Sequence, residues 1–203
     1  MRNEKLTTQE MGRMSVNEYR QADKQPLVVV LDNVRSQHNV GAVFRTADAM
    51  RIAGVRLCGI CCCPPNQEIH KTALGAEETV EWQYYPDTLD AVRDLQAQGY
   101  QVYAVEQAHN SITLEDFANN LTAKRSNSKT VQQQSGLTGG AGHNRIAVVF
   151  GHEVFGVQQE VINLCNGCIE IPQYGTKHSL NVSVTAGIVM YRLASSLRHA
   201  TSM

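Results

Sequence analysis

The sequence predicts an α/β fold in which helices cover both faces of a mostly parallel β-sheet. Short apolar strand patterns alternate along the chain with amphipathic helix patterns, which is typical of β-α-β units. The run Leu27–Asp32 is apolar up to its last residue and rich in valine, as expected for a strand buried on both faces of such a sheet. The 203 residues, 42% of them hydrophobic, suffice for one domain with a sizeable core.

The first part of the chain predicts a short helical extension followed by alternating elements. Residues 1–25 favour one or two short helices, since Ser15 and Glu18 form a capping-box pattern. After the strand 27–32, a helix is expected from Asn39 with Gly54 as its stop. The elements expected next are a strand at 55–60, an irregular or partly helical segment at 68–78, a short strand at 80–85 and a helix at 87–98.

The second part continues the alternation around one unusual segment. Residues 122–145 carry four basic residues and no acidic one, and their polar composition predicts a flexible insertion. The other expected elements are a strand at 100–106, a helix at 113–119, a strand at 146–151, a helix at 157–166, a strand at 168–172 and a closing helix at 180–198. We therefore expect a helical extension at 1–25 and a single domain at 26–203 that contains the insertion.

Composition narrows the class of protein. The formal net charge of −1 counts mildly against a nucleic-acid partner but does not exclude one, because phosphate contacts need only a local basic patch. The longest aliphatic run, Leu27–Leu31, is far too short to cross a membrane. The first 25 residues are polar and carry charges of both signs, so we expect no targeting segment and a cytoplasmic location.

The spacing of the cysteines is compatible with a metal site. They form two C-x-x-C pairs about a hundred residues apart, and one pair begins inside an apolar strand pattern. Reduced, mostly buried thiols are therefore the preferred interpretation, and we expect no metal. The six cysteines are Cys58, Cys61, Cys62, Cys63, Cys165 and Cys168.

Polar sequence follows three of the expected strands, at residues 33–48, 151–157 and 173–183. Each segment alone is an ordinary polar loop. Because ligands of open α/β sheets bind beyond the carboxyl ends of the strands, three such segments at one edge favour a functional site. Gly151 and Gly156 flank Glu153 and are expected to let the backbone approach a ligand closely.

These segments resemble three motifs of the SpoU/TrmH branch of the SPOUT methyltransferases. The matching blocks are Asn39–Asp48, Val149–Val157 and Ile171–Ser183, and their order and spacing extend over nearly the whole chain. The second block departs from the usual pattern at His152 and Val154. Glycine fingerprints of dinucleotide-binding folds, a P-loop and the G-x-S-x-G elbow of hydrolases are missing from the sequence.

The resemblance implies a fold, a cofactor and partners. The fold would end in a deep trefoil knot at the C-terminal end of the chain, and S-adenosylmethionine would bind there through backbone groups. The corresponding motif positions in this chain are Glu106, Gly151, Ile171 and Leu180. The partners would be tRNA or rRNA and a second copy of the chain that shares the active site. The closing helix agrees with a dimer, because its apolar residues surround most of its circumference; these are Val182, Val184, Ile188, Val189, Tyr191 and Leu193.

The resemblance also implies the reaction, which is methyl transfer to a ribose 2′-hydroxyl. Arg45 would act at this hydroxyl. Since arginine is a poor base, we expect it to hold the nearby phosphate and lower the pKa of the hydroxyl. Four further residues, Asn39, Glu153, Ser179 and Asn181, would position Arg45, the ribose and the cofactor loop.

Two other classes of protein remain as alternatives. An inactive RNA-binding or assembly factor on the same fold is the first, although the chain retains Asn39, Arg45, Glu153, Ser179 and Asn181 together. A small-molecule enzyme with a dinucleotide-binding fold is the second, and the missing glycine fingerprint disfavours it.

Overall fold

The computed structural model describes residues 3–7, 9–123 and 145–198. The expected insertion at 122–145 lies outside the described residues except for its first two residues and its last. Within the described part, helix α1 (Val16–Gln21) precedes the sheet, and Ser15 and Glu18 form the predicted capping box. The described part contains no helix long and apolar enough to cross a membrane.

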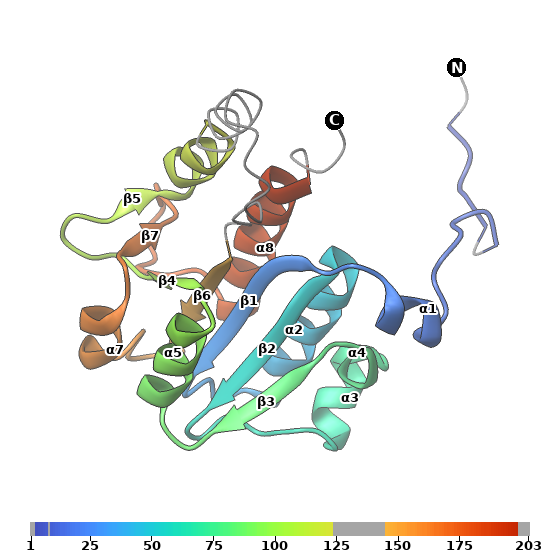
Figure 1. Cartoon of the computed structure of the whole chain (residues 1–203), viewed down its shortest axis with the longest axis horizontal. Helices are drawn as coiled ribbons and strands as arrows, with labels where there is room; N and C mark the ends of the chain where they lie inside the picture. Colours follow the sequence, from blue (N-terminus) through green and yellow to red (C-terminus); the bar gives the residue numbers. More distant parts are fainter. Residues whose placement is uncertain (1–2, 8, 124–144, 199–203) are drawn as a thin grey trace, which may run out of the picture.

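The sheet has seven strands in the order β3-β2-β1-β6-β4-β7-β5, and every strand pairing among the described residues is parallel (Figure 1). The predicted parallel sheet is therefore confirmed. The strands are β1 (Gln25–Asp32), β2 (Ile52–Cys58), β3 (Trp82–Tyr85), β4 (Gln101–Val105), β5 (Ile112–Thr113), β6 (Ile146–Phe150) and β7 (Cys168–Glu170).

Helices cover both faces of the sheet (Figure 1). One face carries α2 (Gln37–Met50), α3 (Gln67–Ala73), α4 (Ala76–Thr79), the helical residues 114–123 and α8 (Val182–Arg198). The opposite face carries α5 (Thr88–Ala97) and α7 (Gln159–Leu164). Asp87 caps α5, since its side chain accepts a hydrogen bond from the N–H of Leu89.

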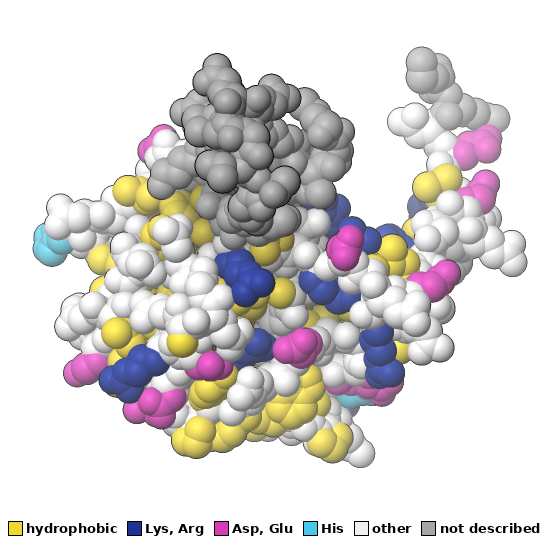
Figure 2. Space-filling view, in the orientation of Figure 1, with side chains coloured by type: hydrophobic (Ala, Val, Ile, Leu, Met, Phe, Trp, Pro, Cys, Tyr) yellow, Lys and Arg dark blue, Asp and Glu magenta, His cyan; other side chains and the backbone are white. Residues whose placement is uncertain are grey.

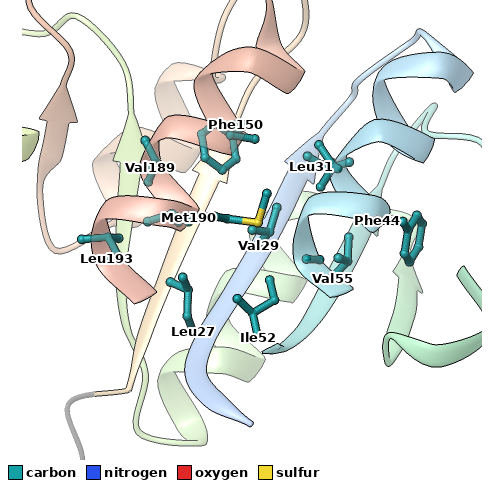
Figure 3. Packing of buried hydrophobic residues seen from close by; sticks show 14 of the residues in the cluster. Leu27, Val29, Leu31, Phe44, Ile52, Val55, Phe150, Val189, Met190 and Leu193 are labelled. Carbon is teal, nitrogen blue, oxygen red and sulfur yellow. The ribbon is translucent and has the colours of Figure 1, made fainter. Parts of the chain in front are cut away.

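Strand β1 separates two apolar cores. Leu27, Val29 and Leu31 pack on the side of α2 and α8, whereas Val28 and Val30 pack on the side of α5. All five are buried, as predicted for a strand with two covered faces. Figure 3 shows the α8 side of this arrangement, where Met190, Val189 and Leu193 lie opposite the strands and Phe44 of α2 lies beside them.

The end of α2 differs from the prediction. Gly54 was expected to stop the helix, but Arg51 ends it in a left-handed conformation with φ of 53°. Gly54 lies inside β2, where an added Cβ would stand 2.7 Å from the carbonyl oxygen of Glu81. The helix also begins earlier, at Gln37, because the hydroxyl of Ser36 accepts the N–H of Asn39.

The cysteines are less buried than expected, because only Cys58 and Cys61 are buried and the other four are partly buried. All six cysteines are free thiols, and burial raises the pKa of Cys58, Cys61 and Cys165 to about 12. These three thiols are therefore protonated at neutral pH.

The charged side chains of the surface are mixed in sign. On the face that Figure 2 shows, basic and acidic side chains are interspersed, in keeping with the near-neutral net charge.

Candidate active site at the carboxyl ends of the strands

A pocket of about 1210 Å³ opens where β4, β6 and β7 end. Its walls come from the ends of these strands, the loop 151–157 after β6 and the segment 171–181 that leads into α8. Seven of the nine predicted site residues line it: Glu106, Gly151, Glu153, Ile171, Ser179, Leu180 and Asn181. Two of the three polar segments, 151–157 and 173–183, thus meet at this edge of the sheet.

Glu153 connects the loop after β6 to the start of α2. Its carboxylate accepts the backbone N–H groups of Arg35 at 3.0 Å and Ser36 at 2.9 Å, and the side-chain amide of Asn39 at 3.1 Å. Partial burial raises the pKa of Glu153, but these donated hydrogen bonds together outweigh it and hold the pKa below its ordinary value. The Glu153 side chain is therefore ionised at neutral pH, and it holds the loop after β6 against the start of α2.

Asn39 extends this contact to the third motif. Its side-chain oxygen accepts a hydrogen bond from the amide of Asn181 at 3.2 Å. The side-chain oxygen of Asn181 in turn accepts the N–H groups of Ser183 at 2.9 Å and Val184 at 3.4 Å, which caps α8. The closing helix, expected from residue 180, therefore begins after a cap at Asn181. Glu153, Asn39 and Asn181 form a hydrogen-bonded chain that joins all three motif blocks.

Glycines allow the loop after β6 to close tightly on itself. A Cβ on Gly151 would stand 2.0 Å from the carbonyl carbon of Gly156, and one on Gly156 would stand 2.2 Å from the carboxylate of Glu106. Gly156 also has φ of 68°. These glycines were expected to let the backbone approach a ligand. Both glycines line the pocket, and the structure shows in addition that each lies close to other protein atoms.

Arg45 lies apart from the other predicted residues. It is exposed on α2, it does not line the pocket of its own chain, and no ion pair between described residues involves it. A surface ion pair with Asp48, three residues along α2, is not formed among the described residues, and Asp48 accepts the hydroxyl of Thr79 at 2.8 Å. Its guanidinium group is therefore available for a ligand or a second molecule.

Sequence reasoning missed two residues that hold the site together. Asp32, fully buried at the end of β1, accepts hydrogen bonds from Thr88, from Asn33 and from both the backbone and the side chain of Gln158. A carboxylate at the end of an apolar strand pattern was the sequence signal that could have identified Asp32. The side-chain amide of Gln107 donates a hydrogen bond to the carbonyl of His178 at 2.7 Å, which connects the end of β4 to the third motif. No sequence pattern marked Gln107.

The chain is similar to known RNA methyltransferases in sequence. The SpoU rRNA Methylase family profile matches residues 26–191. A tRNA (guanosine(18)-2′-O)-methyltransferase of Thermus thermophilus is 29% identical over 182 residues, which cover 90% of this chain and 81% of that protein. A 23S rRNA (guanosine-2′-O-)-methyltransferase of Vibrio vulnificus is 32% identical over 177 residues, which cover 84% of this chain and 61% of that protein.

Solved structures show the same architecture. A TrmH/SpoU tRNA modifying enzyme of A. aeolicus superposes with a TM-score of 0.70 at 21% identity, covering 91% of this chain and 83% of that chain. An AdoMet-bound rRNA methyltransferase of Sinorhizobium meliloti gives a TM-score of 0.67 at 25% identity, covering 89% of this chain and 60% of that chain. From the extent of the profile match, supported by these structural likenesses, the chain belongs to the SpoU rRNA methylase family.

Proposed function

We propose that this protein transfers a methyl group from S-adenosylmethionine to a ribose 2′-hydroxyl of tRNA or rRNA. The observation that carries the proposal is the hydrogen-bonded chain Glu153–Asn39–Asn181 at the rim of the strand-end pocket. Family membership supports the reaction class, and both relatives named above carry 2′-O-methyltransferase in their names.

The pocket suits S-adenosylmethionine, which when bound supplies a methyl group on a positively charged sulfur. Carboxylates of Glu106 and Glu153 line the pocket and favour a cation there, while Ile171 and Leu180 offer apolar surface to a flat base. Backbone groups of Gly151, Ile171 and Leu180, together with that of Glu106, are the proposed cofactor contacts.

The remaining site residues either position the three motifs or contact the substrate and cofactor directly. Glu153, Asn39 and Asn181 hold the three motifs in register, so that the acceptor hydroxyl and the methyl donor meet in line. Ser179, exposed at the pocket wall, is placed to bind the ribose or the cofactor loop. Arg45 holds the phosphate beside the acceptor ribose and lowers the pKa of its hydroxyl, because a nearby cation favours the alkoxide.

We infer a homodimer built on α8. Of its apolar residues, Val182, Val189 and Leu193 are buried in the chain's own core, whereas Val184, Ile188 and Tyr191 are 51%, 40% and 64% exposed. The second group repeats at helical spacing and forms one uncovered apolar face. Because α2 packs against α8, a dimer through this face brings α2 and Arg45 close to the second chain, which supports a shared active site.

A deep trefoil knot at the C-terminal end is part of the proposal. After β7, on the far side of β4 from β6, the chain returns across the sheet, and α8 packs against β1 and α2. The returning segment 171–181 lines the same pocket as the loop after β6, and Glu153 of that loop is hydrogen-bonded to the start of α2. The likeness to TrmH/SpoU structures supports a knotted path.

Calorimetry with S-adenosylmethionine, followed by transfer of its labelled methyl group to RNA, tests the function. We expect saturable binding of the cofactor and incorporation of the label into tRNA or rRNA. Binding of RNA without heat from S-adenosylmethionine and without label transfer would identify an inactive RNA-binding or assembly factor instead.

A further inference from the structure

Two residues of the loop after β6 differ in how they are held. Glu153 turns toward α2 and is held there by three hydrogen bonds, whereas Phe155 is 83% exposed. The adjacent Val154 is 70% exposed, and two consecutive exposed apolar side chains beside a pocket indicate a partner surface more strongly than a single one would.

This exposure is built into a well-held loop. His152 and Gly156 exchange two backbone hydrogen bonds, at 3.0 and 2.9 Å. The N–H of Val154 donates to Nδ1 of His152 at 3.0 Å, which places the ring proton of His152 on Nε2. The imidazole lies against the ring of Phe155, with centroids 4.9 Å apart and planes tilted by 33°. The loop therefore presents Phe155 with a second ring behind it.

Phe155 stands between two hollows. It lines the main pocket together with Glu153, and it also lines a neighbouring hollow of about 590 Å³. Asn33, Gln158 and Gln159 supply amide side chains to that second hollow, and Ile60 and Val157 supply apolar ones. The backbone N–H of the exposed residue Arg35 donates to the carboxylate of Glu153 in this loop. Exposed aromatic faces are a means by which proteins bind single-stranded nucleic acid.

We propose that Phe155, supported by His152, is a stacking surface for a base of the RNA substrate close to the methylated ribose. This inference rests on the proposed function, since it requires an RNA strand at the pocket. Stacking is tolerant of base identity, because every base has a flat π-face, and it holds a strand that has been unpaired for modification. The amides of the second hollow would meet the polar edge of that base.

The test compares substitutions of Phe155 in the full-length protein. The probe is a fluorescent 12-nucleotide oligo(A) RNA, with an abasic strand of equal length as the reference. Phe155→Ala is expected to weaken oligo(A) binding at least about fivefold. Phe155→Trp should retain binding, and Phe155→Leu, apolar but without a ring, should resemble Phe155→Ala. Val16→Ala, at an exposed apolar residue of α1 that lines neither hollow, is the control and should bind oligo(A) as the wild type does.

Three results would overturn this inference. The first is wild-type binding of oligo(A) no tighter than binding of the abasic strand. The second is wild-type affinity in Phe155→Leu, which would mean that the ring has no special role. The third is a fall to monomer mass on light scattering of Phe155→Ala, which would assign the ring to an interface between copies. Calorimetry with S-adenosylmethionine is measured in parallel, so that failure of the proposed methyl transfer is distinguishable from failure of base stacking.

Discussion

Asn39 and Glu153 are 114 residues apart in the chain, yet the side-chain amide of Asn39 donates a hydrogen bond to the Glu153 carboxylate over 3.1 Å. The same carboxylate accepts two backbone N–H groups at the start of α2. Glu153→Gln replaces one acceptor oxygen by a donor, so a donor would face a donor at this partly buried position. We expect a stability loss of about 1 kcal/mol or more and lower methyl transfer, measured by urea unfolding and single-turnover kinetics.

The pH dependence of stability tests the same contact. Because hydrogen bonds lower the pKa of Glu153 in the folded protein, its stabilisation is full above the ordinary glutamate pKa of about 4.3 and is lost as the pH falls through the lower folded value. The melting-temperature difference between wild type and Glu153→Gln should therefore be largest near neutral pH and shrink in acid. Glu160→Gln, at an exposed glutamate, is the control. A difference that does not change with pH would contradict the anchoring role.

Asn181 has two separable roles, as the cap of α8 and as a donor to Asn39. Asn181→Asp retains the capping oxygen but removes the donated hydrogen bond, whereas Asn181→Ala removes both. We expect Asn181→Ala to lose about 1 kcal/mol of stability and Asn181→Asp much less. Both should lose methyl transfer. Full activity in Asn181→Asp would show that the contact with Asn39 is dispensable.

The substitution Arg45→Ala should affect methyl transfer without affecting the stability of the fold. Arg45 is exposed and forms no ion pair among the described residues, so the substitution should change the free energy of unfolding by less than about 0.5 kcal/mol. Cofactor affinity should also stay near the wild-type value, since Arg45 does not line the pocket of its own chain. Methyl transfer should be abolished. Activity within about tenfold of wild type, a barrier change of ~1.4 kcal/mol, would refute the assigned role.

The proposed dimer predicts different outcomes for two adjacent residues of α8. Ile188→Glu adds a charge to the exposed face and should yield a folded monomer without activity, whereas Val189→Glu buries a charge in the core and should unfold the chain. Ala97→Glu on the exposed side of α5 is the control and should remain a dimer. Light scattering at micromolar concentration measures the mass. A wild-type monomer, or a dimeric Ile188→Glu, would exclude this interface.

The parallel sheet and most of the candidate site were predictable from the sequence. Periodic apolar patterns identify β1 and α2 because burial imposes them locally, and polar segments after strands converge because parallel strands end at one edge. The resemblance supplied the identities of Glu153, Asn39 and Asn181, but their mutual contacts required the structure.

The remaining features depend on contacts that no local pattern encodes. Gly54 lies inside β2, where its backbone packs against Glu81, and α2 ends instead at Arg51 in a left-handed conformation. The circumference of α8 predicted that more than one surface covers it, but only the packing separates Val189, which is buried, from Ile188, which is exposed. The exposed ring of Phe155 likewise follows from the closed loop around Gly156 rather than from a motif.

The position of the transferred methyl group tests the central claim most directly. The protein is incubated with methyl-labelled S-adenosylmethionine and RNA from cells that lack the gene, and the RNA is then hydrolysed with alkali. Methylation of a ribose 2′-hydroxyl blocks cleavage at that nucleotide, so the label should remain in alkali-resistant dinucleotides of tRNA or rRNA. Label on a base, released with mononucleotides, or no label despite cofactor binding, would contradict the proposed function.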